Sequence, residues 1–231
     1  MEKIVEKLKE LSDLKYKEFN QKLCPDSNYI FLGIRMPILK KFAKNIMKDD
    51  EKICRKFILK KDVIYFEEVM LQGLFIGYLN DDIKEKATLI EQYLNRVDSW
   101  AHTDSFVPNL KIKSSDLSAY WDFILKYNCS EKEFELRFMI VSMLDYFIID
   151  EYVDSVINIL NDIKHEGYYV KMAVAWTLAE IGIKYYDKAM TFFNGDNKLD
   201  KFTFNKTLQK MIESYRIDDK QKEILRSMKR K

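Results

Sequence analysis

The stretch YYVKMAVAWTLAEIGI, residues 168–183, decides the fold class because its apolar residues surround the helix that it predicts. Val174 faces one side of this helix and Trp176 faces another. A helix that is apolar on nearly every side packs between neighbours instead of lying on a surface. Residues 63–79 and 131–147 have the same character. The three stretches therefore predict the inner helices of an all-α protein.

Helical periodicity continues through the rest of the chain, and no run of alternating apolar residues predicts a β-strand. Helices are expected over residues 2–12, 13–22, 38–47, 50–59, 63–79, 81–94, from 98 to a stop near Pro108, from 114, and over 131–147, 152–163, 168–183, 186–193, 203–214 and 218–229. All-round apolar helices that alternate with amphipathic ones are typical of a right-handed α-solenoid of degenerate HEAT-like repeats. A compact helical bundle is the alternative. No Gly-, Pro- or Ser-rich linker interrupts the pattern, so a single domain over residues 1–231 is predicted.

Composition narrows the class of protein further. Glycine (6) and proline (3) are scarce, which argues against a β-rich protein with many tight turns. Cys24, Cys54 and Cys129 are far apart, and neither His102 nor His165 has a Cys or His at ligand spacing, so no disulfide framework or metal site is expected. A reducing cytoplasm is the expected location. The charged start of the chain and the charges within each apolar segment predict neither a secretory signal nor a membrane span.

Charge is distributed unevenly along the chain. The net charge is +2, but residues 201–231 carry ten Lys/Arg and four Asp/Glu, while the other 200 residues carry 29 basic and 33 acidic side chains. A basic end on a near-neutral body suits an anionic partner such as nucleic acid. A solvated terminal helix would explain the same charges.

Familiar catalytic signatures are missing from the sequence. It contains no phosphate-binding glycine loop, paired-acid motif, nucleophile elbow or metal signature, so no cofactor is expected. A helical repeat protein of this kind is either a binding scaffold or an enzyme whose chemistry comes from a few side chains on a concave surface.

The stretch DSWAHTDS, residues 98–105, is the most chemically pointed part of the chain. Asp98 or Ser99 can cap a helix here, and the spacing of four puts Trp100 and Asp104 on one helix face. Periodicity alone favours a buried Trp100 and a solvated Asp104. His102, close to the acid, either tunes that acid or lies in solvent, and we favour solvent.

Three further residues stand out from the apolar pattern. Arg137 is a cation within an apolar helix, and either pairs with an acid such as Asp104 or Glu180 or holds a phosphate. Trp176 alone reads as packing. Lys171 is a candidate DNA-binding cation, with a solvated lysine as the alternative.

These residues, in this order, resemble the AlkD-like family of DNA alkylation repair proteins over most of the chain. The resemblance is carried by GIRMP at 33–37 with LKKFAK at 39–44, EEVML at 67–71, DSWAHTDS at 98–105 and AVAWTLAE at 173–180. Each motif is weak alone, but their order and spacing are fairly specific.

The resemblance implies a HEAT-like α-solenoid and a monofunctional DNA glycosylase that removes cationic N3- and N7-alkylated purines. It makes Asp104 the catalytic carboxylate, Trp100 and Trp176 the aromatic walls beside the deoxyribose, and Arg137 a contact to a backbone phosphate. The implied partner is double-stranded DNA carrying alkylated purines, with the protein expected to be monomeric. Such members are thought to act without a deep base pocket, unlike most glycosylases.

The late motif departs from the family pattern in two places. Ala175 stands where the family often has Gly, and Ala179 stands at the expected Arg position, which implies one phosphate contact fewer. The alternative function is a non-catalytic scaffold that binds damaged or branched DNA, or a protein partner. In that case the two tryptophans are packing residues, and Asp104 pairs with Arg137.

Overall fold

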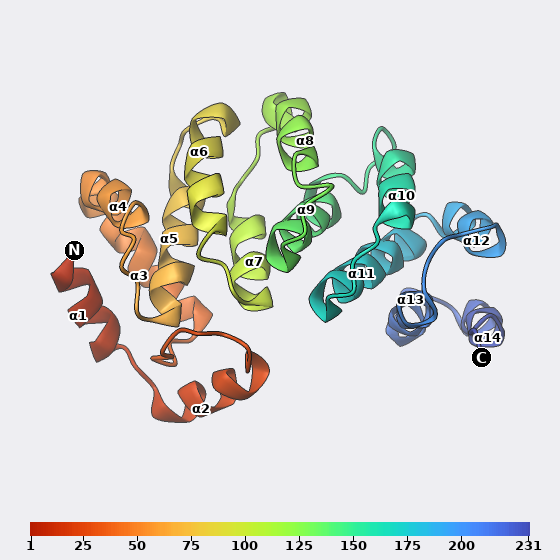
Figure 1. The fold of residues 1–231 in the computed structure, drawn as a ribbon, viewed down its shortest axis with the longest axis horizontal. Coiled ribbons are helices and arrows are strands. Elements are labelled where there is room, and N and C mark those ends of the chain that lie inside the picture. The colour runs from red at the N-terminus through yellow and green to blue at the C-terminus, as the bar shows by residue number, and fades with distance from the viewer. The chain divides into compact units, whose positions relative to one another are not determined.

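The computed structural model describes all residues from Met1 to Lys231 and contains only helices and connecting segments. There are 14 α-helices and two 3-10 helices (Figure 1). The one β-type contact is an isolated parallel bridge between Ile30 and Tyr65. The all-α class is therefore confirmed, while the solenoid arrangement stays a prediction. No helix is both long enough and apolar enough to cross a membrane.

The chain divides into two compact units, Met1–Phe123 and Ile124–Lys231. The predicted single domain stays a prediction. The elements of the first unit are α1 (Glu2–Glu10), α2 (Leu14–Leu23), α3 (Met36–Asp49), α4 (Glu51–Ile58), α5 (Phe66–Tyr78), α6 (Ile83–Leu94), α7 (Trp100–Phe106), η1 (Val107–Asn109) and η2 (Ser114–Asp116). Those of the second are α9 (Glu133–Tyr146), α10 (Val153–Asp162), α11 (Tyr168–Lys184), α12 (Tyr186–Asn194), α13 (Lys201–Glu213) and α14 (Asp219–Ser227). Helix α8 (Leu117–Leu125) contains the boundary.

Helix α5 is the centre of the first unit. Every one of its residues from Phe66 to Gly77 is buried, and it contacts α3, α4, α6 and α7. The predicted packing of an all-round apolar helix between neighbours is confirmed here. Buried Glu67 and Glu68 at its start do not contradict this, because both accept backbone hydrogen bonds.

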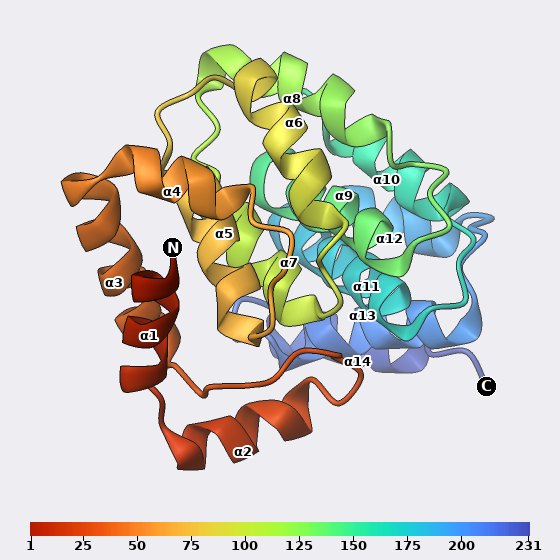
Figure 2. The ribbon, with the colours of Figure 1, turned by 60° about the vertical axis from the view of Figure 1, so that its left-hand side comes forward.

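The segment after α2 turns back past the ends of α7 and α5 before α3 begins (Figure 2). The buried Glu67 carboxylate holds it by accepting backbone N–H groups of Leu32 (2.9 Å), Gly33 (2.7 Å) and Ile34 (3.1 Å). Three donors satisfy a charge that is costly to bury without partners. Gly33 has φ +82°, in the left-handed region that favours glycine. This carboxylate therefore ties the N-terminal third of the unit to its central helix.

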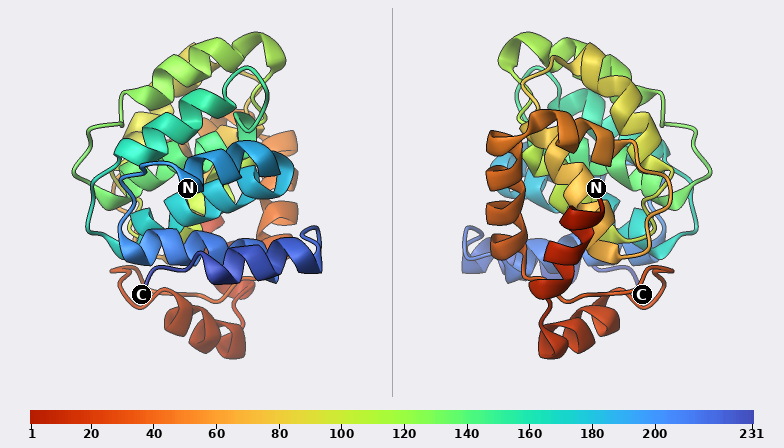
Figure 3. Two further views of the ribbon diagram at one scale, coloured as in Figure 1. Left: turned by 90° about the vertical axis from the view of Figure 1, so that its right-hand side faces the viewer. Right: turned by 90° about the vertical axis from the view of Figure 1, so that its left-hand side faces the viewer.

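Helix α11 occupies the corresponding place in the second unit. It contacts α9, α10, α12 and α13, and most of its residues are buried. Helix α14 packs in turn against α13, and the two lie side by side in the left view of Figure 3. The apolar stretch at residues 168–183 thus forms the central helix of this unit.

Two prolines lie near helix ends, and the helix stop expected near Pro108 is confirmed. Pro37 lies in the first turn of α3, where its missing N–H costs nothing. Helix α7 ends at Phe106, and Pro108 lies in the 3-10 turn that follows it. Boundaries elsewhere differ from the predicted ones by a few residues, as frayed helix ends usually do.

Candidate active site

Helix α7 presents one polar face and one buried face. Ser99 is its N-cap and accepts a hydrogen bond from the Ala101 N–H (3.3 Å). His102, Thr103 and Phe106 are buried against the unit. Trp100 and Asp104, one turn apart, are both partly exposed on the other side. The predicted pairing of an indole and a carboxylate on one helix face is therefore confirmed, and neither residue is sealed in the core.

Asp98 ties the start of α7 to the segment after α2. Its carboxylate accepts hydrogen bonds from the Ser27 hydroxyl (2.9 Å) and the Asn28 N–H (2.7 Å) and lies 3.4 Å from Nδ1 of His102. Burial alone raises the pKa of Asp98, but the contacts with His102, Asn28 and Ser27 outweigh it and leave that pKa below its usual 3.8. Asp98 is thus an ionised anchor, and Ser99 is the cap.

The prediction that His102 lies in solvent is wrong, because its side chain is fully buried. Its ring stacks on Phe66 at a centroid distance of 4.1 Å, and Nε2 lies 3.2 Å from the Phe66 carbonyl oxygen. The other ring nitrogen faces Asp98. His102 therefore joins the start of α7 to the start of α5. Its spacing of four from Asp98 could have indicated this contact, but not its burial.

The Trp100 indole is held in place from outside its own helix. Its Nε1–H donates to the carbonyl oxygen of Leu23, the last residue of α2 (3.0 Å). Asp104 lies near Cys24, whose thiol pKa is raised by burial and, to a smaller extent, by the charges of Asp98 and Asp104. The first unit thus supplies an oriented aromatic ring and a partly exposed carboxylate one helical turn apart.

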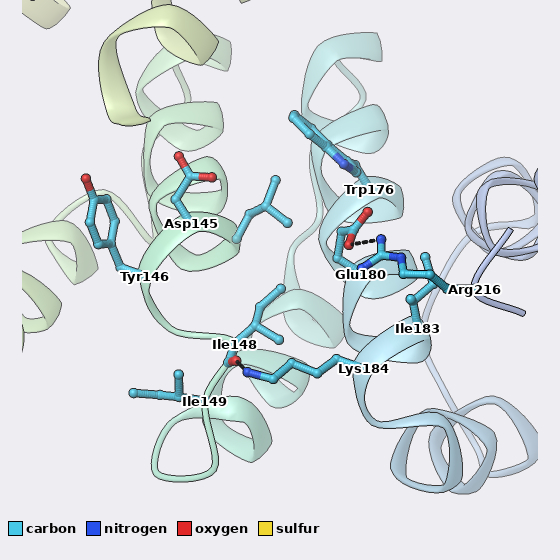
Figure 4. Close-up of a pocket in the computed structure, with 10 residues that line it drawn as sticks. Asp145, Tyr146, Ile148, Ile149, Trp176, Glu180, Ile183, Lys184 and Arg216 are labelled. Atoms are coloured by element: carbon cyan, nitrogen blue, oxygen red, sulfur yellow. Dashed lines mark hydrogen bonds and ion pairs between the residues drawn. The ribbon is translucent and has the colours of Figure 1, made fainter. Parts of the chain in front are cut away.

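In the second unit, Trp176 lines an open pocket of about 530 Å³. Asp145 of α9 and Trp176 of α11 lie on opposite sides of it (Figure 4). Glu180 on its wall forms an ion pair with Arg216 at 2.7 Å, and Lys184 donates to the Ile148 carbonyl oxygen at 2.6 Å. Trp176 is therefore partly exposed beside charged groups, whereas its sequence context alone indicated packing.

The two predicted DNA-binding cations are engaged within the second unit. Arg137 is 5% exposed, and its Nη1 donates to the Tyr169 carbonyl oxygen at 2.6 Å. Lys171 pairs with Glu166 at 2.7 Å and lines a smaller pocket from which Trp176 is absent. Their contact with DNA stays a prediction.

Sequence reasoning missed a guanidinium that lines the same pocket as Trp176. Arg216 lies in the connection between α13 and α14, and 47% of its side chain is exposed. Its partner Glu180 was a suggested partner of Arg137 instead. The spacing of Trp176, Glu180 and Lys184 by four residues could have revealed one shared helix face, but nothing local points to Arg216.

The side chains that commonly bind metal ions are not clustered in this structure. No group of three or more His, Cys, Asp or Glu side chains is arranged to hold a metal ion. Cys24 and Cys54 are buried free thiols, and burial raises the pKa of Cys54 to about 12. Cys129 is exposed and also free.

Residues 4–211 match the family model described as DNA alkylation repair enzyme. The chain belongs to this family. The resemblance drawn from the four motifs is therefore confirmed at the family level, and DNA is indicated as the partner. None of the curated proteins matches the chain. Arg216 and α14 lie beyond the matched residues.

Proposed function

We propose that this member of the DNA alkylation repair family is a monofunctional glycosylase acting on cationic N3- and N7-alkylated purines in duplex DNA. The observation that carries the proposal is the shared exposure of Trp100 and Asp104 on α7. A carboxylate beside an indole suits stabilisation of a developing cation, and hydrogen bonds of Trp100 and His102 hold this helix to other segments of the unit. Such a site needs no cofactor.

The substrate class follows from what one carboxylate can do. An alkylated purine already carries positive charge and leaves readily, so no general acid is required. As the glycosidic bond breaks, positive charge moves onto the sugar. At about 4 Å and an effective dielectric of about 20, the Asp104 carboxylate stabilises that charge by roughly 4 kcal/mol. This corresponds to about three decades in rate, which suffices for a labile bond but not for a neutral base.

The resemblance assigns both tryptophans a role beside the deoxyribose. An indole face attracts a cation by about 0.5–2 kcal/mol, depending on how well water is excluded. Trp100 is oriented by its hydrogen bond to Leu23, so its ring needs little reorganisation when DNA binds. Trp176 supplies a second indole, and its partial exposure in an open pocket supports that role.

The phosphate contacts of this proposal come from the second unit. Arg137 and Lys171 are the residues that the resemblance and the charge pattern favour. Arg216 is the more accessible guanidinium, because 47% of its side chain is exposed against 5% of Arg137. A phosphate that displaces Glu180 from Arg216 would gain a charge-assisted, bidentate contact.

The decisive experiment compares excision with binding for Asp104→Asn. Release of N7-methylguanine from methylated duplex DNA should fall by about 10²- to 10³-fold, while affinity for the duplex changes little. Asp62→Asn removes an equal charge from an exposed position and should leave both unchanged. Equal loss of excision and binding, or unchanged excision, would contradict the assigned role of Asp104. Duplex binding without any base release by the wild-type chain would favour the non-catalytic scaffold.

A further inference from the structure

A second, smaller pocket in the first unit is lined by three lysines. It has a volume of about 240 Å³, room for several waters or one tetrahedral oxyanion. Tyr78 at the end of α5, Lys86 on α6, and Lys111 and Lys113 in the connection between η1 and η2 line it. Cations from separate segments repel one another unless an anion lies among them. Asp81 and Asp116 also line the pocket, so its lining has three cations and two acids.

The backbone around the pocket is built for close approach. A Cβ atom on Gly77 would lie 2.3 Å from the Asn109 carbonyl oxygen, so glycine lets η1 pack directly on α5. Lys111, two residues after Asn109, has φ +50°. Residues other than glycine rarely adopt this left-handed backbone conformation. Lys111 is the only non-glycine residue in the chain with positive φ. Strain of this kind is concentrated at functional sites.

Lys86 is a buried cation with few partners. Only 4% of the residue is exposed, and its ammonium donates to the Leu110 carbonyl oxygen at 3.3 Å. An ammonium carries three donors, so this contact leaves capacity for an acceptor in the pocket. Buried lysines are usually paired with an anion.

The two acids in the lining do not balance its three lysines, and one of these acids is already paired with an arginine. Asp81 is bound by both terminal nitrogens of Arg55, at 2.7 and 2.8 Å. Burial lowers the pKa of Lys86; Asp81 opposes this, Lys113 and Lys111 add to it, and Asp116 opposes it weakly. The net effect is a lowered pKa of Lys86, so its protonated form is less stable here than in water. An anion bound among the lysines would stabilise the protonated form.

Tyr78 adds an unused polar atom. Its hydroxyl is buried without a hydrogen-bond partner, and Lys111 Nζ lies 5.4 Å from the centre of its ring. Buried hydroxyls are nearly always hydrogen-bonded in folded proteins. The Tyr78 hydroxyl is therefore a second polar group of this lining whose hydrogen bond the protein itself does not supply.

We propose that this pocket binds a tetrahedral oxyanion of the phosphate class through Lys86, Lys111 and Lys113, with the Tyr78 hydroxyl as a further donor. The site is separate from Trp100 and Asp104. Neither residue lines this pocket. The proposal therefore does not rest on glycosylase activity. The phosphate is either a free phosphate or monoester, or a phosphate of the DNA backbone.

Equilibrium dialysis with inorganic phosphate tests the site, at constant ionic strength in chloride. The wild-type chain should bind one phosphate saturably. The double variant Lys111→Ala/Lys113→Ala should bind it at least about tenfold more weakly, because two charge-assisted contacts to the anion are lost. Both lysines are exposed, so the double variant should keep the wild-type fold, which circular dichroism checks.

A charge-matched control separates a site from a general charge effect. Lys40→Ala/Lys41→Ala removes two cations from α3 and should bind phosphate as tightly as the wild type. No saturable binding by the wild type, or equal weakening by both double variants, would overturn the proposal. Competition with duplex DNA then identifies the source: displacement of phosphate assigns the site to the DNA backbone, and simultaneous binding assigns it to a free phosphate or monoester.

Discussion

Asp98 shows at the scale of one residue how a short helix can be held rigidly. Its carboxylate accepts hydrogen bonds from Ser27 and Asn28 and contacts the His102 ring. The other ring nitrogen of His102 contacts the carbonyl oxygen of Phe66 in α5. Charge-assisted hydrogen bonds of this kind are stronger than neutral ones. Trp100 and Asp104 follow within two turns, so an anchor at Asp98 limits how far either side chain can move.

Asp98→Asn should therefore destabilise the fold in a pH-dependent way. At pH 7 the free energy of unfolding should fall by about 1–3 kcal/mol, the contribution of hydrogen bonds to a charged group. The folded-state pKa of Asp98 is below 3.8, so the wild-type carboxylate stabilises the fold above its unfolded pKa of about 3.9. That advantage is lost as the pH falls through the folded value.

Urea unfolding of both proteins between pH 3 and pH 7 measures this, in roughly one-unit steps around the reference pKa. The two unfolding free energies should converge toward the acid end. A difference that stays constant with pH would show that Asp98 acts by shape and not by charge. Asp62→Asn is the control, since that residue is exposed.

At the scale of an element, the packing of α2 depends on one residue outside the helix, Gly33. A Cβ atom on Gly33 would lie 2.3 Å from the Asp13 carbonyl oxygen and 2.4 Å from the Lys17 nitrogen, both backbone atoms near the start of α2. These atoms cannot move without moving the helix. The segment after α2 and the helix itself are thus packed through a glycine.

Gly33→Ala should loosen α2 before the rest of the unit. Left-handed backbone costs alanine about 1–2 kcal/mol, and the overlap with α2 adds to this. Limited proteolysis should cut within residues 14–23 earlier than in the wild type, and urea unfolding should shift to lower concentration. Gly195→Ala is the matched control, because its φ is −83° and its nearest contact is 3.3 Å away. Equal effects of the two substitutions would contradict this account.

At the scale of the whole molecule, the basic end of the chain forms α13 and α14. Most of its cations are exposed, and α14 lies beyond the residues that match the family. Under the proposed function this end contributes non-specific attraction for DNA. Such attraction depends on salt because bound phosphates release their counterions.

Lys222→Gln/Arg226→Gln on α14 should weaken duplex binding and flatten its salt dependence. The slope of log affinity against log salt should fall by about 0.9 for each phosphate contact removed. Fluorescence anisotropy at several salt concentrations measures both quantities. Lys3→Gln/Lys7→Gln on α1 removes the same charge at the same spacing and should have the smaller effect. Identical slopes in the two double variants would mean that α14 has no particular contact with DNA.

The sequence by itself determined the helical class, the inner positions of α5 and α11, the helix end near Pro108, and the face shared by Trp100 and Asp104. These depend on periodicity and on interactions between residues close in sequence. Only the tertiary structure decided that His102 is buried, that Glu180 pairs with Arg216, and that Glu67 holds residues 32–34. Each of these contacts joins residues more than 30 positions apart, and helical periodicity carries no information about which distant segments meet.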